Sequence, residues 1–450
     1  MHIMAIIPRV KSLLQAVPRP LGTMLSYVPY RLRPGIGPPY ARYQRDIEIF
    51  EQLESPQKKG FIVAKIQRLL RAAMRVPFYH RLYQAHGVCP EDVRSLVDIA
   101  NLPIVTKEML KAVPLQERSF PVRSRYLTNT GGSSGSPLSF YITISLIPSE
   151  WAHMHTIWSK LGYTQSMLKL VFAGRNLGNR SFLYDGLRHQ YSVNVYKGLE
   201  SVLNDLRKIT RNTSIRYLHG YPSAVAEFAQ GCERFAPDLV DTLRQTLRGA
   251  FLGSEYPAQV YRHRIESVFD IPTISWYGHS ERAILAWEKE GEFIYHPFQT
   301  YGYCEVVPNP DTGGWKLIGT SYENFASPFV RYDTGDDVEP VEIRDGILIS
   351  FRVRSGRAGE FVRDRRGVKI SLTALIFGRH HRIFEIARFV QVRQEKDGEI
   401  LVIVTPQKPL TTGFVFAEWF DTTGLDMKID FEIVDKPILS TSGKVTLKVK

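Results

Sequence analysis

The spacing of apolar and polar positions divides the chain into regions with different predicted structures. Apolar side chains recur every three or four positions in residues 43–75, which predicts helix. Residues 125–127 lead into a turn rich in glycine and serine, and residues 138–146 then alternate apolar and polar side chains. This region therefore predicts a strand, a turn and a second strand.

Between residues 150 and 270, amphipathic segments alternate with short apolar runs, which indicates a largely parallel sheet with helices on its faces. Short β-like segments dominate from residue 273 onward. The predicted helices are 151–161, 199–211, 222–235 and 257–269, the apolar runs are 168–174, 215–221 and 249–255, and the later β-like segments are 273–278, 283–288, 293–297, 303–307, 315–319 and 346–353.

The pattern changes again after residue 355. Residues 389–394 and 399–406 predict a hairpin with a turn at Lys396-Asp397-Gly398, followed by one helix near 413–422 and a final strand at 428–434. The sequence thus predicts an α/β fold in which a large N-terminal domain precedes a small α+β lid domain. The expected divisions are an arm at 1–44, the large domain at 45–355 and the lid at 356–450.

The composition agrees with a multidomain globular protein. The 450 residues are 44% hydrophobic and 23% charged, and single cores stop growing at roughly 250–300 residues, so two or three domains are expected. Cys89, Cys232 and Cys304 are too widely spaced for a disulfide framework or a thiolate zinc site. We interpret them as buried small hydrophobes in a protein of the reducing cytoplasm.

The N-terminal arm is strongly basic. Residues 1–45 contain seven Lys and Arg side chains and no acid, out of a net charge of +13 for the whole chain. As a helix, this arm places Ile3, Ile6, Ile7, Val10, Leu13, Leu14 and Val17 on one side, and Pro18 and Pro20 end it. Two interpretations have equal weight: a peripheral anchor on an anionic membrane surface, or an arm that packs on the body of the protein. No stretch reaches the roughly 18 apolar residues of a membrane span.

The segment Thr130-Gly131-Gly132-Ser133-Ser134-Gly135-Ser136-Pro137 is the most informative part of the chain. Its glycines allow backbone N–H groups to approach an anion closely, and its hydroxyls add donors, as a polyphosphate requires. The same residues formally match the nucleophile elbow of hydrolases, but that elbow requires a following helix, whereas a strand is predicted here. A flexible linker is the third interpretation of the segment taken alone.

Further motifs follow at regular places along the chain. Tyr277-Gly278-His279-Ser280-Glu281 closes a predicted strand, where open α/β sheets place ligand-binding groups. Tyr332-Asp333-Thr334-Gly335-Asp336 follows strand-like residues 329–331, Gly356-Arg357 lies at the predicted domain boundary, and Ser442-Gly443-Lys444 lies near the carboxyl end. In this order and spacing, the set resembles the adenylate-forming superfamily of acyl-CoA synthetases. It is most similar to the phenylacetate–CoA ligase branch, which includes relatives encoded with capsule and surface polysaccharide genes.

This resemblance implies an AMP-forming carboxylate ligase, and it assigns a role to each motif residue. Thr130, Gly131, Gly132, Ser133, Ser134 and Gly135 would hold the β- and γ-phosphates of ATP, and Ser280 would touch the α-phosphate. Tyr277 and Gly278 would bind adenine beside the turn Gly253-Ser254-Glu255. Asp336, assisted by Arg357, would accept the ribose hydroxyls, and Glu281 would hold Mg²⁺. Glu360 stands at the hinge position, and the catalytic Lys444 would reach the α-phosphate and the substrate carboxylate from the lid.

The acceptor of the acyl group is less well defined by the sequence. Leu138 replaces a lysine found in many synthetases, and no coenzyme A signature is recognisable. Coenzyme A is therefore implied by the family alone, and an amine or hydroxyl of a sugar or carrier is the alternative acceptor. A non-catalytic nucleotide-binding scaffold is the rival from another class, and the retention of Glu281 and Lys444 argues against it. Nucleic-acid binding is not expected, because basic residues beyond the arm are interspersed with acids.

Other conspicuous residues have structural interpretations. His219 and His279 are expected either to line the acyl pocket or to be structural, and His380-His381 to lie on the surface. A helix core face is predicted for Trp151, Met154, Ile157 and Trp158.

Overall fold

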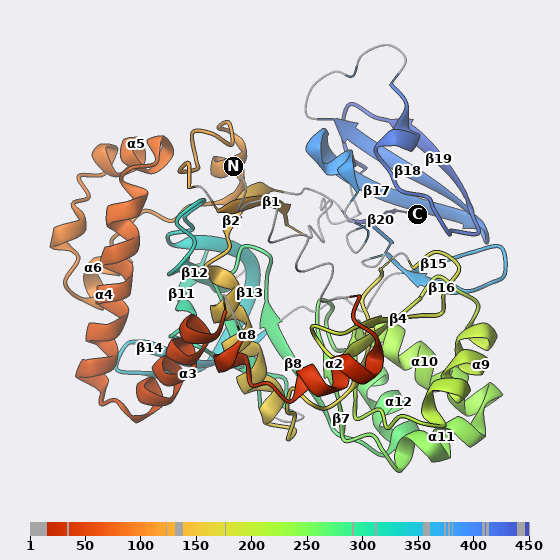
Figure 1. Ribbon diagram of the computed structural model, residues 1–450. Helices are drawn as coiled ribbons and strands as arrows, with labels where there is room; N and C mark the ends of the chain where they lie inside the picture. The colour runs from red at the N-terminus through yellow and green to blue at the C-terminus, as the bar shows by residue number, and fades with distance from the viewer. Residues whose placement is uncertain are drawn as a thin grey trace.

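The fold is built on one long mixed sheet flanked by helices, with a smaller sheet at the C-terminal end (Figure 1). The computed structural model describes residues 16–33, 36–122, 124–130, 138–175, 177–289, 292–310, 313–353, 361–372, 375–376, 379, 381–406, 410, 414–438 and 446–449.

The large sheet has 12 strands in the order β11-β12-β13-β14-β10-β9-β8-β7-β6-β3-β5-β4. Strands β5, β3, β6, β7 and β8 pair in parallel, as the alternation of helices and apolar runs predicted, and β9 to β14 pair antiparallel. Its strands are β3 (Lys169–Phe172), β4 (Phe182–Asp185), β5 (Gln190–Val193), β6 (Tyr217–Gly220), β7 (Gly249–Leu252), β8 (Thr273–Gly278), β9 (Leu285–Glu288), β10 (Ile294–Pro297), β11 (Gly302–Asn309), β12 (Gly314–Ser321), β13 (Tyr332–Arg344) and β14 (Ile347–Val353).

Helices cover both faces of the parallel part. The described α-helices are α2 (Arg19–Ser26), α3 (Gly37–Gln52), α4 (Ser55–Ala73), α5 (Pro77–Ala85), α6 (Leu96–Ala100), α7 (Lys107–Lys111), α8 (Leu146–Ser159), α9 (Leu199–Thr210), α10 (Pro222–Phe235), α11 (Pro237–Arg244) and α12 (Gln259–Phe269). The apolar faces of α9 to α12 form one core with the parallel strands, and α3 and α8 contribute to a second. In that second core Met154, Ile157 and Trp158 are buried, which confirms the core face predicted for α8.

Three smaller sheets lie in the regions of the predicted turn and lid. β1 (Arg125–Asn129) pairs antiparallel with β2 (Ser139–Thr143), which confirms the two predicted strands, while the predicted turn at 131–137 lies outside the described residues. A strand, and not the helix that a nucleophile elbow needs, therefore occupies residues 139–143. The C-terminal residues form the sheet β19-β18-β17-β20 and the pair β15-β16. These strands are β15 (Phe361–Arg363), β16 (Lys369–Ser371), β17 (Ala387–Lys396), β18 (Glu399–Pro406), β19 (Lys428–Ile433) and β20 (Lys448–Val449).

Several expected elements differ from the structure. The helix predicted at 43–75 is two helices, because α3 ends at Gln52 and Pro56 lies in the first turn of α4. The helix expected near 413–422 is only a short 3-10 turn, Phe416–Glu418, within the described residues. Pro18 and Pro20, which were expected to end the arm helix, begin another helix: Pro18 precedes α2, and Pro20 lies in its first turn. The arm helix predicted before Pro18 lies almost entirely outside the described residues.

Candidate active site

Glu281 lies just beyond the end of β8 and is held by two side chains. The Tyr332 hydroxyl donates to its Oε1 at 2.8 Å, and His279 Nδ1 lies 3.1 Å from its Oε2. Burial by itself raises the pKa of this carboxyl, but the hydrogen bond and charge of His279, together with the bond from Tyr332, lower it below its ordinary value. Glu281 is therefore a buried, ionised and oriented carboxylate.

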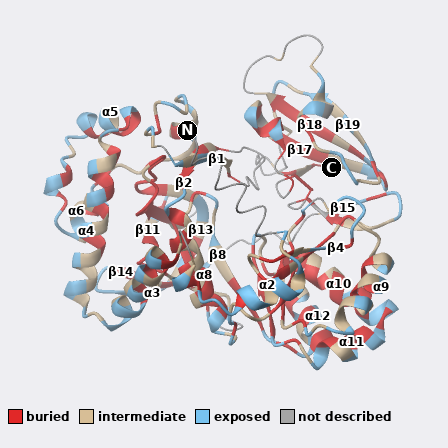
Figure 2. Cartoon of the chain, in the orientation of Figure 1, coloured by how far each residue is buried: buried red, intermediate tan, exposed pale blue. Residues whose placement is uncertain are grey.

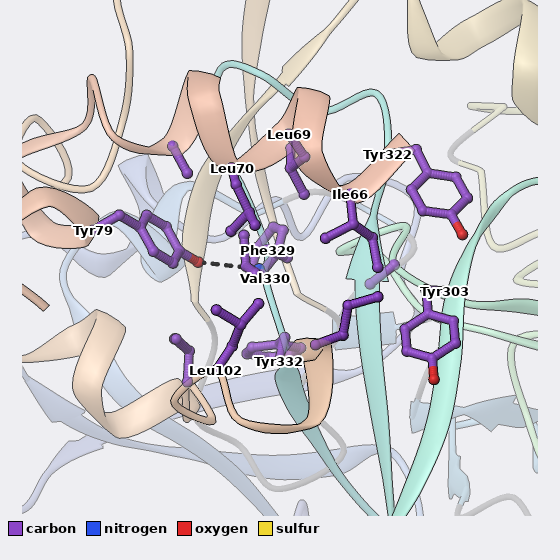
Figure 3. Close-up of a cluster of buried hydrophobic side chains, with 14 of the residues drawn as sticks. Ile66, Leu69, Leu70, Tyr79, Leu102, Tyr303, Tyr322, Phe329, Val330 and Tyr332 are labelled. Atoms are coloured by element: carbon purple, nitrogen blue, oxygen red, sulfur yellow. Dashed lines mark hydrogen bonds between the residues drawn. The ribbon is translucent and has the colours of Figure 1, made fainter. Parts of the chain in front are cut away.

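Tyr332 is itself fixed by the hydrophobic core. Figure 3 shows its ring among buried side chains contributed by α4, α5 and the strands around β13. Its ring centroid lies 5.0 Å from that of Phe329 in an edge-to-face arrangement. Burial raises the pKa of Tyr332, so its hydroxyl stays protonated and donates to Glu281. Core packing thus fixes the direction of the carboxylate.

Asp336 lies four residues further along β13, in a tight turn. Gly335 has a φ of +77°, and its N–H donates to Asp333 Oδ1 at 2.9 Å. The Tyr277 hydroxyl donates to Asp336 Oδ2 at 2.6 Å, which joins the end of β8 to the start of β13. Desolvation by the surrounding protein raises the pKa of Asp336. Part of the residue nevertheless remains exposed to solvent and accessible to a ligand.

Lys107, at the start of α7, is a cation that the sequence analysis missed. A bridge between Val105 and Tyr332 brings this segment to the start of β13, and the Asp333 N–H donates to the Val105 carbonyl at 2.9 Å. Burial lowers the pKa of Lys107, while the charges of Glu281 and Glu108 oppose this shift. The local sequence Thr106-Lys107-Glu108 has the pattern of a helix N-terminus, with Thr106 as the cap, but this pattern does not indicate a site residue.

The glycine- and serine-rich segment is anchored at both ends. The Leu138 N–H donates to Thr130 Oγ1 at 2.9 Å, and the Thr130 N–H donates to the Leu138 carbonyl at 3.0 Å. Thr130 is buried, and its two hydrogen bonds with Leu138 hold the two ends of the segment together. Gly131, Gly132, Ser133, Ser134 and Gly135 lie outside the described residues, as do Arg357, Glu360 and Lys444.

The turn after β7 is shaped by close packing. A Cβ added to Gly253 would lie 2.3 Å from the Trp276 ring, so only glycine fits there. Ser254 has a φ of +67°, and Glu255 accepts a hydrogen bond from the Ser223 hydroxyl at 2.7 Å. Because β7 and β8 are parallel neighbours, this turn, Gly278 and the exposed Ser280 all lie at the carboxyl edge of the sheet.

Two of the minor predictions were wrong. His381 is buried, its ring stacks on Phe420 at 3.7 Å between centroids, and both ring nitrogens are hydrogen-bonded. Cys89 is exposed, whereas Cys232 and Cys304 are buried as expected. His219 is partly buried on β6 between Trp158 and Trp276, and desolvation lowers its pKa to about 3, so it is neutral.

The chain is similar in sequence to two known proteins. No family model matches the chain. The chain is 23% identical over 382 residues to Protein CapK of Staphylococcus aureus, covering 80% of this chain and 78% of that protein. It is also 23% identical over 317 residues to phenylacetate-coenzyme A ligase of Aromatoleum evansii, covering 65% of this chain and 68% of that one.

Solved structures of acyl-CoA ligases share the fold of this chain. 2-Hydroxyisobutyryl-CoA ligase, in complex with 2-HIB-AMP and CoA in the thioesterification state, aligns with a TM-score of 0.53 at 17% identity. That alignment covers 88% of this chain and 90% of the other. The post-adenylation state of the same ligase, with R3-HIB-AMP, gives a TM-score of 0.52 at 18% identity. The predicted fold class and family resemblance are confirmed, and these relatives support the prediction of an AMP-forming ligase.

Proposed function

We propose that this chain activates a carboxylic acid with ATP and transfers the acyl group to coenzyme A. In the first step a carboxylate oxygen attacks the α-phosphorus of ATP, and the bond to pyrophosphate breaks to give an acyl-adenylate. In the second step the thiol of coenzyme A, having lost its proton, attacks the acyl carbon and AMP leaves. Splitting the reaction in this way turns an unreactive carboxylate into an acyl donor.

The observation that carries the proposal is the pair of carboxylates where the end of β8 meets the start of β13. Glu281 is held ionised by His279 and Tyr332, and Asp336 is held by Tyr277. One carboxylate is buried and the other is exposed, so the pair offers two different binding environments within one site. A hard cation suits the first, and a polar hydroxyl pair suits the second.

Mg²⁺ fits the residues around Glu281. The carboxylate is anionic and preoriented, and the described residues contain no group of three or more His, Cys, Asp or Glu that could hold a metal by themselves. We therefore assign Mg²⁺ to Glu281 together with oxygens of the nucleotide, as is usual for this ion. When bound, it neutralises phosphate charge. His279 Nε2 and Asn129 Oδ1 are buried without hydrogen-bond partners among the described residues and are suited to polar ligand atoms.

The remaining roles follow the family pattern. Asp336 would bind the ribose hydroxyls with Arg357, Tyr277 and the turn Gly253-Ser254-Glu255 would contact adenine, and Ser280 would contact the α-phosphate. Tyr277 fixes the plane of the Asp336 carboxylate before the ribose binds. Loop 131–137, closed by Thr130, would bind the terminal phosphates.

We further propose that residues 45–355 form the adenylation domain and residues 356–450 a lid that carries Lys444, with Glu360 at the hinge. The separate C-terminal sheet supports this division. Among the described residues, β16 and the turn before it make polar contacts with the large domain: Lys369 Nζ lies 3.2 Å from Glu227 Oε2, and Arg366 donates to the Tyr196 carbonyl at 3.2 Å. The ring of Tyr196 is also buried in the hydrophobic core of the C-terminal residues. The ion pair is partly exposed and of modest strength, whereas movement of the lid would have to uncover the buried Tyr196 ring.

Similarity to CapK favours a role in surface polysaccharide assembly at the cytoplasmic side of the cell. An amine or hydroxyl of a sugar or carrier is then the alternative acceptor in place of coenzyme A.

The test is a pyrophosphate-release screen across aryl, fatty, hydroxy and amino acids, with and without coenzyme A. We expect release that depends on one class of carboxylic acid and falls roughly 10²–10³-fold in Glu281→Gln. Glu233→Gln, at an exposed carboxylate on α10, is the matched control and should behave as the unmodified chain. Carboxylate-dependent release that is equal in all three proteins would contradict the role of Glu281, and binding of ATP without any turnover would favour the scaffold.

A further inference from the structure

Helix α2 packs on the large domain through its small side chains. Gly22 and Ser26 are buried, and a Cβ added to Gly22 would lie 2.3 Å from the Tyr184 hydroxyl oxygen on β4. The chain is then fixed by Tyr30, whose N–H donates to Gln165 Oε1 at 3.0 Å and whose ring lies 5.4 Å from that of Tyr40. The segment therefore has a defined side against the body and a defined side toward solvent.

The solvent side of this segment is apolar. Leu21 is 55% exposed and Met24 is 69% exposed, and both lie on the side of α2 opposite Gly22 and Ser26. Figure 2 shows exposed positions along α2 at the surface of the molecule. We call the following exposed side chains the α2 surface: Leu21, Met24, Leu25, Tyr27, Val28 and Leu32.

This arrangement is the reverse of an ordinary surface helix, which buries its large apolar side chains and exposes polar ones. Removing the α2 surface from water would release the hydration of six apolar side chains that folding leaves exposed. The helix is therefore placed to contact a second apolar phase.

The part of the chain that carries the α2 surface contains only positive charges. Arg19 and the exposed Arg31 flank it, and residues 1–45 contain seven basic side chains and no acid. Two copies of such a segment repel each other, which disfavours self-association through this surface. An anionic lipid surface offers both the apolar phase and the opposite charge. Among the described residues no helix is long and apolar enough to cross a membrane, so contact would be at the interface.

We propose that the α2 surface docks the protein on an anionic membrane. Leu21, Met24 and Tyr27 enter the boundary between headgroups and acyl chains, while Arg19 and Arg31 lie against lipid phosphates. The docking site is thus a folded part of the protein body, distinct from the arm helix expected at residues 3–17. The proposal combines the two interpretations of the arm, as a membrane anchor and as a segment that packs on the protein. One side of α2 packs on the body of the protein, and the other side faces the membrane.

Vesicle co-sedimentation of the full chain tests this proposal without relying on its enzymatic activity. We compare phosphatidylcholine vesicles with vesicles containing one-third phosphatidylglycerol, at low and high salt. The variants are Leu21→Glu with Met24→Glu, and Arg19→Gln with Arg31→Gln. Val260→Glu on α12, at a side chain 67% exposed, is the matched control. A chain lacking residues 1–15 separates α2 from the preceding segment, and melting curves check that each variant folds.

We expect salt-sensitive binding to anionic vesicles that falls at least about tenfold in each double variant and is unchanged in the Val260 variant. Partial binding by the chain lacking residues 1–15 also supports the proposal. Equal binding by the Leu21/Met24 variant and the Val260 variant overturns it. So does complete loss of binding on removal of residues 1–15, or concentration-dependent self-association without lipid that the Leu21/Met24 variant abolishes.

Discussion

Replacing Tyr332 with phenylalanine isolates the contribution of one hydrogen bond to the buried carboxylate Glu281. The hydroxyl donates to Oε1 at 2.8 Å, and the ring is held by the core, so the substitution removes one oxygen and leaves the packing in place. A hydrogen bond to a charged group contributes about 1.5–3 kcal/mol. Its loss leaves His279 as the remaining described partner of the carboxylate.

The sign of the pH effect follows from the lowered pKa of Glu281. A carboxyl with a lowered folded-state pKa stabilises the protein above its unfolded pKa, and this stabilisation is lost as the pH falls through the folded value. Without the bond from Tyr332, the pKa of Glu281 rises, so protonation begins at higher pH. The acid limb of the adenylation rate should therefore move to higher pH in Tyr332→Phe.

The assay is carboxylate-dependent exchange of pyrophosphate into ATP, measured across the acid limb. We expect a roughly 10–100-fold lower rate at neutral pH, because the side chain orients the carboxylate to which we assign Mg²⁺. Tyr322→Phe is the matched control, since Tyr322 lies in the same core and its buried hydroxyl has no hydrogen-bond partner among the described residues. An acid limb and a rate that are the same in both variants would refute the reasoning.

Two further predictions concern the nucleotide and the lid. Asp336→Asn should weaken ATP and AMP binding by roughly 10–100-fold, and 2′-deoxy-ATP should bind poorly to the unmodified chain. The control Asp337→Asn, at the neighbouring residue that accepts a hydrogen bond from Asn309, should bind ATP normally. Calorimetry measures these affinities, and equal affinities for ATP and 2′-deoxy-ATP would count against a ribose contact. Lys444→Ala should lower pyrophosphate release by roughly 10²–10³-fold with little change in ATP binding, with Lys436→Ala as the control, and an unchanged rate would remove Lys444 from the mechanism.

The sequence predicted those elements whose apolar pattern is determined locally. Strands β3, β6 and β7 are short runs that alternate with amphipathic helices, and this order alone predicts parallel pairing. Strand β13 was not predicted, because it begins with Tyr332-Asp333-Thr334-Gly335-Asp336, a polar turn-like sequence. Pairing with β12 and β14 stabilises it, and such pairing is a tertiary effect that periodicity does not report.

The contacts within the site could not be predicted from local sequence patterns, because the residues that make them are far apart in the sequence. Glu281 and Tyr332 are 51 residues apart, and Tyr277 and Asp336 are 59 apart. The motifs predicted that these regions would share one site through their resemblance to a family, but no spacing rule identified Tyr332 as the partner of Glu281. Lys107 was missed for the same reason, since only the bridge from Val105 to Tyr332 brings it close.

Curvature of the sheet explains how the two halves of the site meet. Strand β13 is separated from β8 by β14, β10 and β9, and neighbouring strands lie about 4.8 Å apart, so a flat sheet would place them roughly 19 Å apart. The Tyr277 hydroxyl nevertheless lies 2.6 Å from Asp336. Register shifts interrupt β13 against β12 between Lys316 and Ile318 and against β14 near Glu342, and such bulges increase local bending and twist. The contact between Tyr277 and Asp336 therefore requires a sheet that curves between β8 and β13, and the long Tyr277 side chain spans part of the remaining distance.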